Sequence, residues 1–220
     1  MLRRLVVVAS FVACAGPALA QDSRFEIGGT IGHTLSDGVE FAGVLAANGQ
    51  LYDGIEPTDG NSWGLSLGIF ASPNVEVGVL FDRQGSTLDV TGTNPVTIGD
   101  MNVDNYHGYV GYDFGDSDSK IRTYVMGGIG MTRYNSVSFA NGGVIGETEG
   151  NSQFSTTWGA GLKIYPSQRF GLKLGARWTP TYIKSDATGW WCDPYWGCYV
   201  TGDAQYSNQM SFGGGVLLRF

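Results

Sequence analysis

The amino-acid sequence predicts an all-β protein: a closed, antiparallel transmembrane β-barrel of about eight strands, with short periplasmic turns and long extracellular loops. Three observations lead to this prediction. Bulky apolar residues recur at every second position along many segments, as they do in strands with two different faces. Glycine accounts for 35 of the 220 residues, and charged residues for only 15%, where about 25% is usual. The N-terminus has the features of an export signal.

Residues 1–20 have the three parts of a cleaved signal peptide. Arg3-Arg4 provide the basic start, a short apolar run follows, and Ala18-Leu19-Ala20 supply the small residues at the cleavage site. The apolar run is shorter than the roughly 20 residues that a membrane helix needs. We therefore expect the barrel domain to comprise residues 21–220. The alternative is a lipoprotein cleaved before Cys14, although the residues ahead of this cysteine fit a lipoprotein signal poorly.

Charge and cysteine content narrow the possible partners. A net charge of -7 argues against a nucleic-acid partner. Cys192 and Cys198 lie close together in an exported chain, so we expect them to form a disulfide in an oxidising compartment. The sequence indicates no cofactor, and the acidic residues of the long loops lack the spacing of a metal site.

Eight strands are expected, four in each half of the mature chain. In the first half of the mature chain, alternation is found in residues 25–31, 63–69, 75–82 and 106–114. In the second half, it is found in residues 122–131, 154–164, 170–179 and 209–220. The connections after the second, fourth and sixth strands are short, while the other connections are long, polar and rich in glycine. Short turns on one side and long loops on the other are typical of outer-membrane barrels.

Alternation alone does not decide which face meets lipid, because a lipocalin-like soluble barrel would bury the apolar face instead. The opposing face here is rich in glycine, serine and threonine, whereas a solvated face would normally carry many Lys and Glu residues. The apolar face has aromatic residues towards the strand ends, as an interfacial girdle would. These residues are Trp63, Phe81, Phe154, Trp178, Tyr206 and Phe212. We therefore expect the bulky residues to point outwards into lipid.

The signal peptide, the eight alternating segments and the ending Met210–Phe220 resemble the OmpA/OmpX-like family of small outer-membrane β-barrels. The resemblance implies location in the cell outer membrane, with membrane lipid and lipopolysaccharide as neighbours. It also implies that the barrel-assembly machinery reads a C-terminal signal of alternating apolar residues. The residues of this signal are Phe212, Val216, Leu218 and Phe220.

Charged residues on the small-residue face are expected to meet inside the barrel. These lumen residues are Glu26, Glu76, Asp82, His107, Asp113, Arg122, Lys163, Lys173, Arg177 and Arg219. Buried charges are tolerated when they are paired and hydrogen-bonded, so one interpretation is a salt-bridge network that plugs the barrel. The other interpretation is an ion-selective pore. We favour the plug, because a barrel of about eight strands is only wide enough for side chains to fill it.

Two further functions were considered from the sequence. A lipid-A-modifying enzyme would need a Ser-His-acid relay at the outward rim, and no such arrangement is evident near His33 or His107. Residues 186–205 are a candidate recognition loop for an unidentified external ligand, since exposed aromatic clusters often mark interaction sites. Its aromatic residues are Trp190, Trp191, Tyr195, Trp196 and Tyr199. They could instead pack on neighbouring loops or rest among lipopolysaccharide headgroups.

The sequence therefore favours a non-enzymatic outer-membrane protein that contributes to envelope integrity or surface interaction. A small porin-like channel is the alternative, and a lipid-A-modifying enzyme is a third hypothesis.

Overall fold

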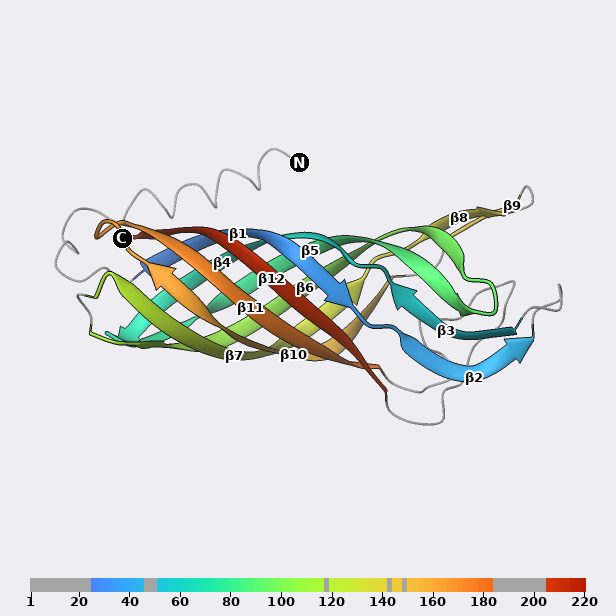
Figure 1. Ribbon diagram of the computed structural model, residues 1–220, viewed down its shortest axis with the longest axis horizontal. Helices are drawn as coiled ribbons and strands as arrows, with labels where there is room; N and C mark the ends of the chain where they lie inside the picture. The colour runs from blue at the N-terminus through green and yellow to red at the C-terminus, as the bar shows by residue number, and fades with distance from the viewer. Residues whose placement is uncertain (1–24, 46–50, 117–118, 142–143, 148–149, 184–204) are drawn as a thin grey trace, which may run out of the picture.

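The protein forms a long barrel of tilted antiparallel strands with an extension at one end (Figure 1). The computed structural model describes residues 25–45, 51–116, 119–141, 144–147, 150–183 and 205–220. The expected signal peptide, residues 1–20, lies outside the described residues. Within the described part of the chain, no helix is long and apolar enough to cross a membrane.

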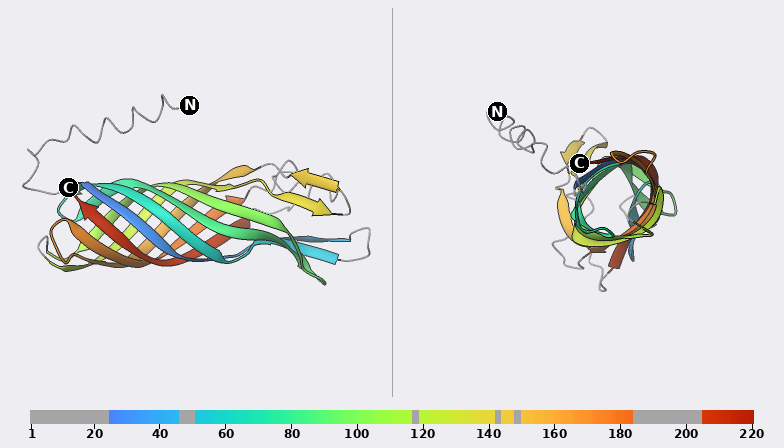
Figure 2. Two further views of the ribbon diagram at one scale, coloured as in Figure 1. Left: turned by 90° about the horizontal axis from the view of Figure 1, so that it is seen from above. Right: turned by 90° about the vertical axis from the view of Figure 1, so that its left-hand side faces the viewer.

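Eight strands close the barrel, and they follow one another around the ring in chain order. They are β1 (Phe25–Ser36), β4 (Gly60–Ser72), β5 (Val75–Gly92), β6 (Val96–Phe114), β7 (Ile121–Tyr134), β10 (Asn151–Ile164), β11 (Phe170–Ile183) and β12 (Gln205–Arg219). β1 pairs with β12, so the first strand meets the last and the ring is complete, as the end-on view in Figure 2 shows. Closure satisfies the backbone groups that an open edge would leave unpaired in lipid. The predicted fold class is confirmed.

The connections after β4, β6 and β10 and both ends of the described chain lie at the same end of the barrel, which we call the short-turn end (Figure 1). The backbone N–H of Phe25 donates to the carbonyl of Phe220 at 3.2 Å, and the reverse bond measures 3.0 Å. The side chain of Asn74 joins two of the turns, because its amide donates to the carbonyls of Asp113 and Gly115 at 2.6 and 2.8 Å. Gly115 has a φ of 106°, a left-handed conformation that favours glycine.

The opposite end continues beyond the barrel as paired strands. β2 (Val39–Leu45) and β3 (Leu51–Pro57) form a hairpin, and β3 pairs with the far end of β5. β5 and β6 also remain paired up to Val90 and Val96, so only a few residues separate the two strands. A second hairpin consists of β8 (Ser138–Asn141) and β9 (Val144–Glu147).

This extension corrects the expectation of long loops after the first and third predicted strands, because much of both connections is paired strand. Outside the membrane, the two faces of a strand no longer meet lipid and lumen, so strict alternation is not required and the sequence pattern fades. The extension instead buries its own apolar cluster. The members of this outer cluster are Val39, Ile55, Leu88, Met101, Val103, Tyr134, Val137 and Ile183.

The outer cluster predicts a modest cost for losing one methylene group. Ile55 is 7% exposed and pairs with Val39 on one side and Val90 on the other. Ile55→Val should lower the free energy of unfolding by about 0.5–1.5 kcal/mol, measured by urea titration of the refolded protein in lipid vesicles. Val96→Ala, at an exposed site near the hairpin tip, is the control and should change little. Equal losses in both variants would contradict the packing.

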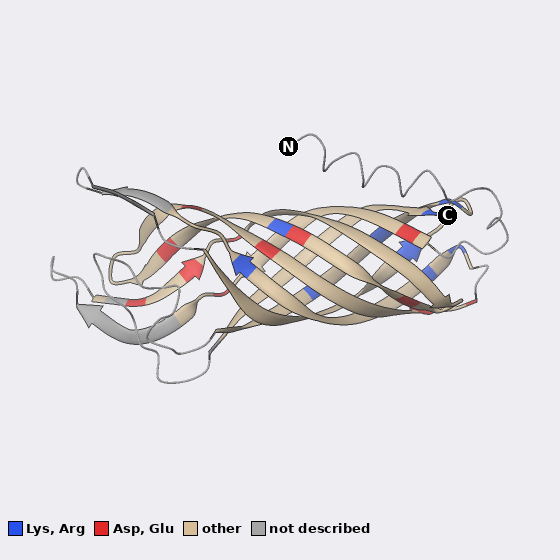
Figure 3. Cartoon of the chain, turned by 180° about the vertical axis from the view of Figure 1, so that it is seen from behind, with Lys and Arg blue, Asp and Glu red and all other residues tan. Residues whose placement is uncertain are grey.

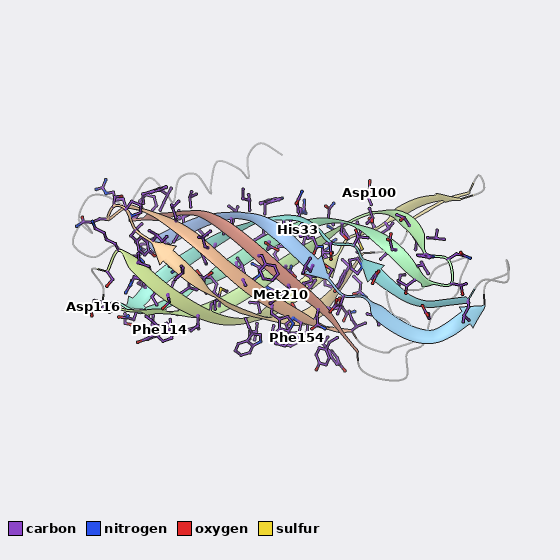
Figure 4. All side chains as sticks on the ribbon, in the orientation of Figure 1. His33, Asp100, Phe114, Asp116, Phe154 and Met210 are labelled. Carbon is purple, nitrogen blue, oxygen red and sulfur yellow. The ribbon has the colours of Figure 1, made fainter. Side chains whose placement is uncertain are left out.

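The barrel wall places its apolar side chains outwards and its charges inwards. Ile31, Ile129 and Leu174 are 74%, 66% and 54% exposed, whereas Arg122 and Lys163 are only 2% and 1% exposed. Figure 4 shows Phe114 and Phe154 projecting from the outer surface. This distribution is the reverse of a soluble barrel and matches lipid outside and polar filling inside.

Candidate functional site in the barrel lumen

Lys163 stands at the centre of a charge cluster near the short-turn end of the lumen. Its Nζ atom lies 2.7 Å from Glu76, 3.0 Å from Glu26 and 3.2 Å from Asp113. The three carboxylates come from β5, β1 and β6, and Lys163 itself lies on β10. One ammonium therefore joins strands from opposite sides of the ring.

Two arginines complete the neutralisation of these carboxylates. Arg219 contacts Glu26 through Nε at 2.9 Å, and Arg122 contacts Asp113 through Nη1 at 3.4 Å. Arg122 also donates to the carbonyl of Pro73 at 2.9 Å, which attaches the cluster to the first short turn. We call Glu26, Glu76, Asp113, Arg122, Lys163 and Arg219 the periplasmic plug.

Two tyrosines donate hydrogen bonds to carboxylates of the plug. The Tyr165 hydroxyl donates to Glu26 at 2.8 Å, and the Tyr109 hydroxyl donates to Glu76. Arg219 lies over the Tyr165 ring, 3.7 Å from its centroid. The charges are therefore both paired and hydrogen-bonded, which is the condition for tolerating them away from water.

The mid-barrel contains the remaining charged residues of the predicted set, arranged differently. Arg177 and Asp82 form an ion pair at 2.8 Å. Lys173 pairs with no carboxylate among the described residues, and its Nζ atom lies 4.6 Å from the centroid of the Tyr124 ring. The structure thus brings six of the ten sequence-predicted lumen residues into one cluster and holds the others apart from it.

His107 belongs to a column of uncharged polar groups in the outer half of the lumen. Its Nε2 atom lies 2.9 Å from Ser155 Oγ, and Thr132 donates to Ser155 at 3.0 Å. Asn105 and Gln209 continue the column with a bond of 2.8 Å. The sequence analysis named His107 but not its uncharged partners, for which the parity of each strand was the available signal.

The two histidines occupy different surroundings, and the described part of the chain places neither of them in a relay with an acid. His107 is buried, and its Nδ1 atom has no hydrogen-bond partner among the described residues. His33 is on the outer face, where its Nδ1 atom lies 3.5 Å from Asn61. Figure 4 shows His33 on the barrel wall well away from the short-turn end.

The outer rim carries an ion pair that the sequence analysis missed. Arg83 binds Asp104 through two nitrogens at 2.6 and 2.7 Å, a bidentate arrangement. Beyond the rim, acidic positions prevail on the extension (Figure 3). Burial, together with the neighbouring carboxylates of Asp89, Asp37 and Asp59, raises the pKa of Glu56.

The raised pKa of Glu56 predicts a pH-dependent gain in stability on its neutralisation. A carboxyl with a higher pKa in the folded state than in the unfolded state lowers stability at neutral pH, and this penalty disappears as the pH falls through both pKa values. Glu56→Gln should therefore raise the urea midpoint at pH 7 but not at about pH 3.5. Asp100→Asn makes the same charge change on the exposed hairpin and is the control. A gain from Glu56→Gln that is the same at both pH values would contradict the prediction.

Several sequence predictions fall outside the described residues. The expected disulfide between Cys192 and Cys198 is among them, as is the aromatic set of the loop at 186–205. The residues of the expected C-terminal assembly signal are described, and all of them point outwards. They are Phe212, Val216, Leu218 and Phe220.

Comparisons with known proteins give the family of this chain and solved structures of similar fold. A family model described as an outer membrane protein beta-barrel domain matches residues 6–220. Among solved structures, OprG from Pseudomonas aeruginosa has a TM-score of 0.65 at 13% identity, covering 90% of this chain and 96% of that one. Neisserial surface protein A has a TM-score of 0.54 at 14% identity, covering 89% and 97%.

A third similar structure is the outer membrane protease OmpT from Escherichia coli, with a TM-score of 0.51 at 9% identity, covering 91% of this chain and 98% of that one. At such identities the likeness shows the fold alone. A comparison with curated protein sequences finds no match.

Proposed function

Since this chain belongs to the outer membrane protein beta-barrel domain family, and lies in the cell outer membrane, we propose that it is a non-enzymatic barrel that supports envelope integrity or external contacts. The fold does not select this role by itself. The solved structures of similar fold include one named a surface protein and one named a protease. The choice rests on this chain's own lumen and surface.

The periplasmic plug is the observation that carries the proposal. Lys163, Glu26 and Asp113 are each 3% exposed or less, and they come from three different strands. A conducting lumen needs a continuous path of water, whereas this section is occupied by paired charges whose separation would strand them in a low-dielectric environment. The plug therefore favours a barrel that does not conduct over a small channel.

The extension supports the outward-directed part of the proposal. Paired strands continue beyond the barrel and are held together by the outer cluster, so they present a defined surface outside the membrane (Figure 1). A surface that is already ordered loses less conformational entropy on binding than a flexible loop does.

Single-channel recording in planar bilayers is the decisive experiment. The purified protein should give no sustained current steps, because the plug leaves no water path. Sustained, ion-selective steps would support a small porin-like channel instead. The same preparation should be checked for correct folding by its resistance to urea, so that inactive material is not mistaken for a closed barrel.

A deletion strain separates the two parts of the proposed role. Loss of the protein should increase sensitivity to detergents, and the wild-type protein should restore resistance. A variant with residues 38–57 replaced by a short Gly-Ser turn retains the barrel and the plug. Failure of this variant despite normal assembly assigns the role to the β2–β3 hairpin of the extension, and restoration assigns it to the rest of the protein. Normal resistance of the deletion strain would contradict the envelope role.

The absence of catalysis is part of the same proposal. It is supported by the position of His107, which is enclosed in the lumen and bonded to Ser155, and by the lack of an acid partner for His33 among the described residues. Mass spectrometry of lipid A should give the same spectrum with and without the protein. A mass change that His33→Ala abolishes would overturn the proposal.

A further inference from the structure

A cavity of about 70 Å³ lies in the middle of the lumen, beyond the periplasmic plug. Its lining includes Lys173, Arg177 and Asp82, together with hydroxyl groups from β1, β4 and β12. A cavity needs about 10–15 Å³ to hold a single water, so this one has room for a water-sized species or a small ion.

The backbone itself keeps this space free of side chains. Gly32 on β1 and Gly213 on β12 face one another across the seam of the barrel and both line the cavity. A Cβ atom at Gly32 would lie 2.3 Å from the carbonyl oxygen of Phe212, and one at Gly213 would lie 2.6 Å from that of Ile31. Because the obstructing atoms are backbone, the two strands leave no room for a side chain at either position, so glycine is required on this side of the cavity.

Across the whole described lumen, positively charged side chains outnumber negatively charged ones. Five described lumen side chains are cationic and four are anionic. The cations are Arg122, Lys163, Lys173, Arg177 and Arg219, and the anions are Glu26, Glu76, Asp82 and Asp113. Lys173 is the cation without a carboxylate partner among the described residues. It also stands directly opposite Lys163 in the β10–β11 register, so its nearest charged neighbour across the pair of strands is another cation.

Two cationic donors remain available at the cavity. Lys173 has three N–H groups, and none of them has a hydrogen-bond acceptor or a carboxylate partner among the described residues; its Nζ atom lies over the face of Tyr124. The Nε–H of Arg177 is buried and has no hydrogen-bond acceptor among the described residues. The Nη2 atom of Arg177 lies 2.8 Å from Asp82 Oδ1, an ion pair in which this oxygen has no hydrogen-bond partner among the described residues. Ser66 adds a hydroxyl donor to the lining, while the Ser211 hydroxyl, which also lines the cavity, is bonded to Thr34 at 2.8 Å. Cationic and hydroxyl donors around a small space are the chemistry that holds an anion.

We propose that this cavity binds a small monovalent anion of the size of chloride, held by Lys173 and Arg177. The anion neutralises the excess cation of the lumen. It also gives an acceptor to donors that are removed from bulk water. None of the charged residues at this site is a member of the periplasmic plug, although Lys173 stands opposite Lys163 across β10 and β11.

Anomalous diffraction from crystals soaked in sodium bromide tests the proposal directly. The wild-type protein should show a bromide peak in the cavity, in contact with Lys173 Nζ. Lys173→Met should lose the peak, whereas Lys120→Met, which removes an exposed lysine from a periplasmic turn, should keep it. A wild-type cavity without bromide, or a peak unchanged in Lys173→Met, would overturn the proposal.

A measurement in solution is independent of the crystal. Replacing sodium methanesulfonate with sodium bromide at equal ionic strength should raise the urea midpoint of the wild-type protein. The midpoint of Lys173→Met should not respond, while that of Lys120→Met should follow the wild type. Removal of Lys173 leaves no carboxylate unpaired, so this variant is expected to fold. An equal response of the wild type and Lys173→Met would count against the site.

Discussion

Replacing Lys163 with methionine is expected to lower the free energy of unfolding by about 3–5 kcal/mol, the range for removing one partner of a buried ion pair. Methionine has a similar length and can fill much of the space, so the loss comes from charge rather than from a void. Glu26, Glu76 and Asp113 would remain in the lumen without the ammonium that contacts all three. Urea-induced unfolding in lipid vesicles measures the change.

Two further variants isolate the cause of this loss. Lys120→Met removes the same charge from an exposed turn and should change stability by less than about 0.5 kcal/mol. Combining Lys163→Met with Glu76→Gln removes one of the stranded carboxylates and should recover part of the loss. If Lys163→Met is no more destabilising than Lys120→Met, the central position of Lys163 in the plug is wrong.

The second large effect concerns the outer wall. Leu174 is 54% exposed on β11, about midway between the periplasmic end of the strand at Phe170 and the aromatic residue Trp178. Leu174→Arg places a charge against the hydrocarbon and should cost about 2–4 kcal/mol, the range for arginine at the bilayer midplane. Unfolding by urea from vesicles of defined lipid composition gives the measurement.

An arginine placed near the membrane interface provides the matched control. Phe170 also faces outwards, but it lies at the end of the strand, so Phe170→Arg should cost only about 0–1 kcal/mol. A soluble barrel would show no such dependence on depth. Equal losses at the two positions would therefore contradict the assignment of the apolar face to lipid.

The barrel was predictable because lipid imposes a simple rule on each strand. Residues such as Leu172 and Leu174 must be apolar, while Lys173 between them faces the lumen. This rule holds only within the membrane. Residues 86–102 lie beyond it, and their pairing depends on backbone hydrogen bonds and on a local cluster that includes Leu88 and Met101, neither of which produces a strict alternation.

The members of the plug were predictable, but their partners were not. Parity placed Lys163 and Lys173 on the lumen face, and the structure sets them side by side across β10 and β11. Only Lys163 reaches carboxylates, one of which, Glu76, is 87 positions away in the sequence. The stagger of strands around a closed barrel decides such contacts, and no single segment of sequence contains that information.

The seam between β1 and β12 has a consequence for biogenesis. Glu26 is in register with Arg219, and His33 is in register with Phe212. The barrel strand that comes first in the chain therefore pairs with the barrel strand that comes last. Such a non-local pairing is slow to form, because a long stretch of chain must be ordered before its ends can meet. β12 must therefore be translated before the barrel can close. Until then β1 presents an open edge, and the unsealed polypeptide has to be shielded from aggregation throughout its transit.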